Sequence, residues 1–420
     1  MSNSKSIRWS SNGRIIPQLE PHTKAKHQLL EEYIKNWIII LCANHGWKET
    51  TVTLVDGFCG GGIYRDDNNH LWEGSPIRMI KMIEEGHRIV QEERSKPYHK
   101  LNVKFIFIEK EKEHIECLRK QIIEHGFGQY LESGQCILIC KEFISAVDDC
   151  INFAKKGHSF FFLDPFGIDD IDMDSVRKII ALKRSEILWS YMIHSLTRIL
   201  PNINNNYRII QEILEAGEYY QEIPNNKDMI VRQQYLKNQS MLLIREKSQV
   251  KFIYPFALMK NKQSVLYYLV HLANDPKAIE VMKKYIWQYN NLEYRYHYNI
   301  FGSGFRTIDY YENNLKLYDI EEVNLNHCLT EISDKLLTII NSTPEDIVVD
   351  DLYNYHILEQ SPGTLDHLVK SLNQLRDGGE IEIIKPDNKI FKGNNIDKRY
   401  RIRQCQLKQL TFFDLNSFIE

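Results

Sequence analysis

The 420-residue sequence has little of what would place it quickly in a class of proteins. It contains no run of about 18 apolar residues, the length that a helix needs to cross a bilayer, so we expect no membrane-spanning helix. Its first residues, MSNSKSIRWSSNGR, are polar and carry no apolar signal region. We therefore expect a cytoplasmic protein.

Strong charge of one sign and paired cysteines are also missing. The formal net charge is −3 at pH 7, which argues against a strongly basic nucleic-acid-binding protein but is compatible with a local basic patch. Cys136 and Cys140 are four residues apart, yet no second pair and no His cluster accompanies them, so we predict no metal site. Most of the eight cysteines lie in apolar runs and are interpreted as small core residues in a reducing compartment.

What the sequence does have is a regular alternation of apolar strands and amphipathic helices. Its length and its 43% hydrophobic content predict two or three domains with a large core. The alternation predicts a doubly wound α/β domain with a mostly parallel sheet, followed by two further strands, 251–259 and 264–272, that form a hairpin. A helical, polar insertion is predicted at 194–248. The predicted strands of the alternating part are 52–56, 103–108, 136–140, 159–163 and 186–191.

The stretch VTLVDGFCGGGIY at 52–64 is the strongest motif. A buried strand ends at Asp56, and Gly57, Gly60, Gly61 and Gly62 follow, where glycine permits tight turning and close approach of a ligand. An acid and a glycine loop at the carboxyl edge of an open α/β sheet indicate a small-molecule site. The spacing is not that of a dinucleotide site, and the alternative is a glycine-rich turn without a ligand. The segment resembles the first motif of S-adenosylmethionine (SAM) methyltransferases, D-x-F-x-G-x-G, which includes Phe58.

Acidic residues follow the next two predicted strands. Glu109 closes the second strand, where nucleotide-binding α/β folds hold ribose hydroxyls, although it can also be an ordinary strand-end residue. Glu142 and Phe143 follow the third strand, as an acid and an aromatic ring that flank an adenine or as a favourable helix start. Lys24 lies in the first turn of the predicted helix 23–43, with Lys26 and His27 beside it, either facing an anionic ligand group or solvent.

The fourth strand, FFFL, ends in the motif Asp164-Pro165-Phe166-Gly167. If SAM lies over the first glycine loop, its sulfonium faces Asp164, whose carboxylate would accept the N–H groups of an acceptor amine and aim the nitrogen lone pair. Pro165 stiffens the backbone and Phe166 offers a face for a flat base. The alternative is a strand-end turn without catalysis.

The succession of these motifs resembles the three-Cys-motif partner (TcmP) family over residues 20–290. The similar segments are TKAKH, LVDGFCGGGIY, EGSPIRMI, FIFIEK, FFFLDPFGI and LVHLANDPKAIEVMKKYIW. The resemblance implies a bacterial or phage protein with a methyltransferase-like Rossmann fold, encoded beside a three-Cys-motif protein that resembles a radical-SAM enzyme. It also implies SAM as cofactor. The implied cofactor residues are Lys24, Asp56, Gly57, Gly60, Gly62 and Glu109, and the implied active-site edge is Asp164–Gly167.

The motif D-P-F-G is also similar to the fourth motif of tRNA guanine-N2 methyltransferases, which favours an exocyclic amine on RNA. It lacks the second proline of the usual amino-methyltransferase motif D-P-P-Y. A non-catalytic adaptor of the three-Cys-motif protein therefore stays open as an alternative function.

The last part of the sequence changes character. Short predicted helices at 335–341, 347–355 and 364–378 and a hairpin at 380–392 predict a winged helix, with the third helix and the basic tail 398–403 available to nucleic acid. Asp366 and Asp377 at the ends of that helix leave a protein-binding or structural winged helix open, as well as a DNA-binding regulator. The predicted division is 1–20 loose polar arm, 21–290 Rossmann domain, 291–333 linker or cover and 334–420 winged helix.

Overall fold

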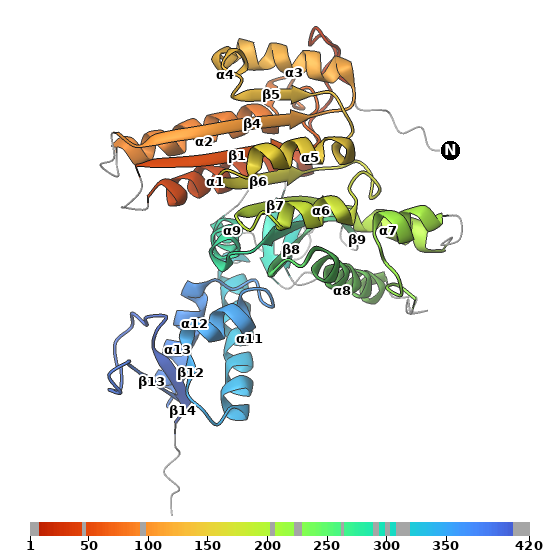
Figure 1. The fold of residues 1–420 in the computed structure, drawn as a ribbon. Coiled ribbons are helices and arrows are strands. Elements are labelled where there is room, and N and C mark those ends of the chain that lie inside the picture. The colour runs from red at the N-terminus through yellow and green to blue at the C-terminus, as the bar shows by residue number, and fades with distance from the viewer. Residues whose placement is uncertain are drawn as a thin grey trace, which may run out of the picture. The chain divides into compact units, whose positions relative to one another are not determined.

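The computed structural model describes residues 8–43, 48–92, 98–201, 206–221, 229–261, 264–288, 294–298, 303–307 and 320–405. The chain divides into two compact units, Met1–Ile320 and Glu321–Glu420, each of which is described by itself (Figure 1). Parts of the predicted arm (1–7), of the predicted linker and of the C-terminal end (406–420) lie outside these residues. None of the described helices is both long and apolar enough to span a membrane.

The first unit is built on a mixed sheet. Its described strands are β1 Glu49–Asp56, β4 Lys100–Ile108, β5 Cys136–Ile139, β6 His158–Leu163, β7 Ser185–Tyr191, β8 Phe252–Asn261, β9 Ser264–Ala273, β10 Tyr294–Tyr298 and β11 Ser303–Thr307. Their order is β10-β11-β8-β9-β7-β6-β1-β4-β5. The five strands from β7 to β5 are parallel, and β9 is antiparallel to both β7 and β8. The predicted doubly wound α/β fold with its terminal hairpin is confirmed.

Helices cover both faces of this sheet (Figure 1). The described α-helices of the unit are α1 Pro21–Cys42, α2 Ser75–Glu92, α3 Lys112–Glu124, α4 Gly128–Glu132, α5 Phe143–Ala154, α6 Met173–Ile180, α7 Ile193–Ile199, α8 Met229–Ser248 and α9 Pro276–Gln288. Tyr33 and Trp37 of α1 pack on Phe160, with ring centroids 5.5 and 6.1 Å apart. Phe161 belongs to the core cluster that includes α5 and α6. Because successive strand residues point to opposite faces, the apolar run of β6 serves both layers.

The order of the strands creates a switch point beside β1. From β1 the chain continues outward to β4 and β5 on one side, and it then returns to place β6 and β7 on the other. Ligands of open α/β sheets bind in the crevice outside the carboxyl ends of the strands at such a point. Residues that follow β1, β4, β5 and β6 are therefore brought to one edge.

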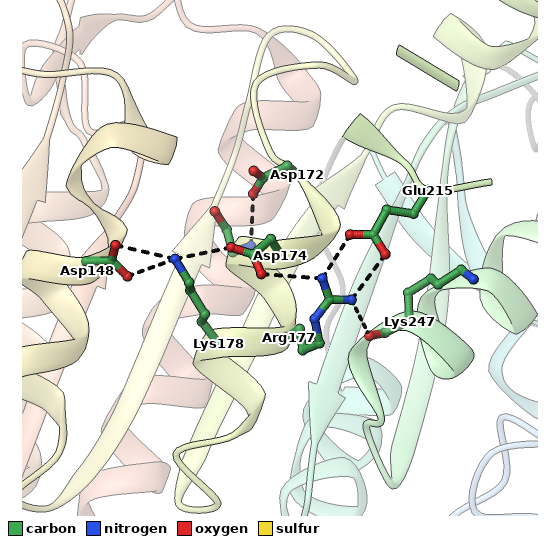
Figure 2. Close-up of polar contacts among 8 residues, drawn as sticks. Asp148, Asp172, Asp174, Arg177, Lys178, Glu215 and Lys247 are labelled. Atoms are coloured by element: carbon green, nitrogen blue, oxygen red, sulfur yellow. Dashed lines mark hydrogen bonds and ion pairs between the residues drawn. The ribbon is translucent and has the colours of Figure 1, made fainter. Parts of the chain in front are cut away.

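The insertion after β7 is held to α6 by a charged network (Figure 2). Arg177 of α6 donates to both carboxylate oxygens of Glu215 (2.8 and 3.2 Å) and to the carbonyl of Lys247 (3.0 Å). Lys178 pairs with Asp148 of α5 at 3.0 Å and with Asp174 at 3.1 Å. The segment between α7 and α8 includes a π-helix, Arg208–Ile213, which ends two residues before Glu215. The network thus ties this segment to the layer of α5 and α6.

Three segments before residue 334 differ from the sequence prediction. Residues 8–20 are not a loose arm, because Trp9 and Leu19 are buried and the backbone of Leu19 bonds to that of Arg65. The loop after the glycines forms a small hairpin, β2 Ile63–Arg65 with β3 Leu71–Glu73. The predicted linker 291–333 contains β10 and β11, which extend the sheet, and the start of helix α11, Ile320–Ser342. Because this stretch is rich in Tyr and Asn and has few periodic apolar residues, its sequence did not indicate the two strands.

The second unit combines helices with a small antiparallel sheet. After α11 it contains β12 Ile347–Val348, α12 Val349–Asp351, a π-helix Leu352–Ile357, α13 Leu365–Asp377, β13 Ile381–Ile384 and β14 Arg401–Gln404, in the sheet order β12-β14-β13. The predicted second hairpin strand, 389–392, is not a strand and makes only an isolated bridge from Ile390 to Ile384. Its place in the sheet is taken by β14, which the sequence prediction had assigned to the basic tail.

Candidate functional site

Asp56 ends β1 as a fully buried carboxyl group. It accepts hydrogen bonds from the Ser75 hydroxyl (2.6 Å) and from the backbone N–H of Phe58 (3.1 Å). Burial raises the pKa of Asp56 to about 7, against the lowering effect of these two hydrogen bonds. Its immediate contacts are therefore within the protein, and it holds the start of the glycine loop to α2.

The glycine loop makes room for a side chain of the N-terminal segment. A Cβ on Gly61 would lie 2.3 Å from Cγ of Trp9, and one on Gly60 would lie 2.8 Å from the same ring. Gly60 and Gly62 have positive φ angles of 57° and 75°, which glycine adopts without strain. On the far side, a Cβ on Gly62 would meet Leu118 at 2.5 Å. These glycines are thus required for close packing within the protein.

A cavity of about 320 Å³ opens on the other side of the loop, at the carboxyl ends of β1, β4 and β5 and beside the segment that follows β6. This size lies within the range of small-molecule sites. Phe143 packs against Phe58 with ring centroids 5.6 Å apart. Six of the site residues predicted from the sequence line this cavity, namely Gly57, Phe58, Glu109, Glu142, Phe143 and Phe166.

Glu109 brings a negative charge into this cavity. Burial alone would raise its pKa, but the nearby His114 and the backbone N–H of Glu111, at 3.0 Å, outweigh burial and lower the pKa. Nδ1 of His114 lies 3.6 Å from Oε1 of Glu109. A largely buried yet ionised carboxylate at the end of the second parallel strand is suited to accept hydrogen bonds from a pair of hydroxyl groups.

Glu142 is the N-cap residue of α5, but its side chain makes no capping hydrogen bond. The carboxylate is exposed and lines the cavity instead. Phe166 also lines the cavity and is 66% exposed, so one face of its ring is open for stacking. Arg208 lines the same cavity from the insertion, a contribution that sequence patterns gave no means of finding.

Asp164, by contrast, does not line the cavity. Its Oδ2 pairs with Nζ of Lys26 at 2.5 Å, and its Oδ1 is buried without a hydrogen-bond partner among the described residues. Lys26 is only 4% exposed and lies 4.9 Å from the ring centroid of Tyr267. Like Asp56, Asp164 therefore faces the side of the sheet that α1 and α2 cover.

The remaining predicted residues are placed apart from the cavity. Nζ of Lys24 lies over the ring of Trp72, 5.5 Å from its centroid. Pro165 is buried, and the N–H of Gly167 donates to Asp170 at 2.7 Å in the turn after β6. The sequence places Lys24 and Lys26 in the same helical turn and predicts Lys24 as the ligand contact. Only the fold shows which lysine reaches Asp164, because helix α1 meets β6 through a contact 138 residues apart in sequence.

Similarity to known proteins is low. No family model matches the chain, and no curated protein matches it significantly. The solved structure of cofactor-bound Rv0187 from MTB matches 61% of this chain and 91% of its own, with 8% identity and a TM-score of 0.27. An O-methyltransferase from Bacillus cereus in complex with SAH matches 61% of this chain and 82% of its own, with 11% identity and a TM-score of 0.27. Likeness at this level decides neither ligand nor reaction, which must be inferred from the side chains at the strand ends.

Proposed function

We propose that the chain is a SAM-dependent methyltransferase that acts on an amine of a nucleic acid, together with a radical-SAM-like three-Cys-motif partner. One observation carries the cofactor assignment. An ionised Glu109, the exposed carboxylate of Glu142 and the paired rings of Phe58 and Phe143 surround one cavity at the switch point of a doubly wound sheet.

The cavity residues fit an adenosine group. Glu109 would accept the two ribose hydroxyls, and Phe143 would hold the adenine ring with Glu142 at its polar edge. Gly57 leaves space between them, since a Cβ there would lie 2.7 Å from Leu163 and 2.9 Å from Phe143. When bound, SAM supplies a methyl group activated by its sulfonium. The protein supplies orientation, and Asp164 would accept an N–H of the acceptor amine.

A nucleic-acid substrate is supported by the first unit more than by the second. Phe166 offers an exposed ring beside the cavity, and Lys110 and Arg208 lie around it. In the second unit the cations of the basic tail are already paired with acids. The pairs are Lys398–Asp350, Arg399–Asp397, Arg401–Asp346 and Arg403–Glu382.

The exposed face of α13 has a mixed charge. It presents Asp366, Lys370, Gln374 and Asp377 to solvent. Phosphate attraction requires unpaired positive charge, so we favour the winged-helix-like second unit as the surface for the protein partner.

The test is transfer of tritiated methyl from SAM to total tRNA, rRNA and DNA. Label in one of the three pools that is lost in Asp164→Ala supports the proposal and identifies the class of nucleic acid. An equal amount of label with Asp164→Ala would refute the assigned role of this residue.

A second candidate function is favoured by the placement of Asp164. Because this carboxylate lies outside the cavity and is paired with Lys26, the chain can also be an adaptor that holds the cofactor for its partner without transferring methyl. Binding of SAM, co-purification with the three-Cys-motif protein and no label in any nucleic acid would identify the adaptor.

A further inference from the structure

Lys26 and Asp164 form a largely buried ion pair at the edge of the sheet, in which the Asp164 side chain is 24% exposed. Lys26 is 4% exposed, and its ammonium is enclosed by Asp164 and the ring of Tyr267. The pair joins α1 to the end of β6. Burying two charges is costly, and such a pair is often replaceable by apolar residues without loss of stability. Its presence at the strand end therefore calls for an explanation other than stability.

The two oxygens of Asp164 are not equivalent. Oδ2 is occupied by Lys26, whereas Oδ1 is buried and has no hydrogen-bond partner among the described residues. A buried oxygen of a charged group without a donor is rare in proteins and usually indicates an unmet partner. A single N–H donor of a ligand would satisfy it.

We propose that Lys26 is a positioning residue of the methyl-transfer site, which occupies Oδ2 so that Oδ1 alone receives the acceptor N–H. This inference rests on the proposed function and refines its substrate to a neutral amine. The acceptor nitrogen uses its lone pair to form the bond to the methyl carbon while the carbon–sulfur bond breaks onto sulfur, and the nitrogen then gives one proton to water. Lys26 acts only through Asp164.

The charges around Asp164 are consistent with this division of roles. Among the described residues, Lys26 is the only ion-pair partner of Asp164. His22 lies one turn before Lys26 on α1, and burial, followed by the charge of Lys26, lowers its pKa to about 4. His22 is thus neutral at pH 7 and does not compete for the carboxylate. Tyr64 and Asp56 also interact electrostatically with Asp164.

Binding of two SAM analogues tests the inference without a known substrate. S-adenosylhomocysteine lacks the transferable methyl, and sinefungin carries a protonated amine at that position. The inference requires that the sulfonium end of the cofactor extends from the cavity past the glycine loop to Oδ1. By calorimetry on the full chain we therefore expect sinefungin to bind roughly tenfold more tightly than S-adenosylhomocysteine, because its ammonium would then contact Oδ1. Asp164→Asn should remove this preference.

Variants of Lys26 separate positioning from structure. In Lys26→Met the preference for sinefungin should increase, because the ammonium then has the carboxylate to itself. Methyl transfer to the labelled nucleic acid should fall roughly 10- to 100-fold in kcat, because Asp164 is no longer held in place. Lys26→Arg should restore both quantities toward those of the wild type. Lys35→Met, which removes a half-buried lysine of the same helix that pairs with Glu32, should change neither.

The outcomes distinguish the two proposals. If neither analogue binds, the proposed function fails and this inference with it. If both bind with the same preference in the wild type, Asp164→Asn and Lys26→Met, the inference is refuted while the cofactor assignment stands.

Discussion

The packing of Trp9 on the glycine loop predicts that Gly61→Ala destabilises the protein when Trp9 is present and does not when Trp9 is removed. In Gly61→Ala, the added methyl would lie 2.3 Å from Cγ and 2.4 Å from Cδ1 of Trp9. These are atoms near the base of a rigid ring, so the indole as a whole must move. Gly61 is not among the glycines with positive φ, and alanine is therefore strained there only by the indole.

Two limits bound the loss of unfolding free energy in Gly61→Ala. Overpacking a buried site costs about 1–3 kcal/mol. Complete release of Trp9, which is 2% exposed, would expose about 150–250 Å² and cost at most about 4–6 kcal/mol at roughly 25 cal/mol per Å². We expect Gly61→Ala to lower the free energy of unfolding by about 2–4 kcal/mol, between these two bounds.

The assay is a double-mutant cycle by urea denaturation. In the Trp9→Ala background the clash is absent, and Gly61→Ala should be neutral or stabilising by up to about 1 kcal/mol through the unfolded chain. Gly128→Ala serves as the control, since its Cβ meets only Ile123 at an ordinary 3.7 Å. A similar loss of stability for Gly61→Ala with and without Trp9 would refute the reasoning.

Three further predictions concern charged groups. Asp56 is protonated more readily in the folded protein than in the unfolded chain, because its pKa is raised to about 7 from 3.8. The free energy of unfolding should therefore fall as pH rises from 4 to 7, by on the order of 4 kcal/mol. Asp56→Asn should remove this pH dependence in urea denaturation. Arg177→Ala should cost about 1 kcal/mol and speed hydrogen exchange in 206–221, the segment held through Glu215 (Figure 2); unchanged exchange there would contradict the anchoring role. Replacing the three arginines of 399–403 by glutamine should change the slope of log K against log[salt] for RNA or DNA by less than about one unit; a loss of about three would show that these cations contact phosphates.

The sequence was most informative where local chemistry and strand order coincide. A residue that closely follows a parallel strand lies near the carboxyl edge of the sheet. Glu109 directly follows β4, and Phe143 and Phe166 come within four residues of the ends of β5 and β6, so all three line the cavity at this edge. Contacts between residues far apart in the sequence could not be predicted from local sequence patterns. The glycines of 60–62 were interpreted as ligand contacts, whereas two of them accommodate Trp9, a residue of the predicted loose arm.

The sequence also could not predict the side of the sheet to which each strand-end residue points. Asp164 and Phe166 are two residues apart, yet one pairs with Lys26 of α1 and the other lines the cavity. The turn after β6 breaks the alternation that a strand would impose, so spacing alone could not separate them. The same limit explains why Lys24 was selected in place of Lys26, since neighbouring helix residues point in different directions.

The most direct test of the central claim is a calorimetric titration of the full chain with SAM. We expect saturable binding that weakens roughly 10- to 100-fold in Glu109→Gln, as befits the loss of hydrogen bonds to a charged group. Glu113→Gln, which alters an exposed carboxylate of α3, should bind like the wild type. Absence of binding in the wild type, or equal affinity in Glu109→Gln, would contradict the assignment of the cavity to SAM.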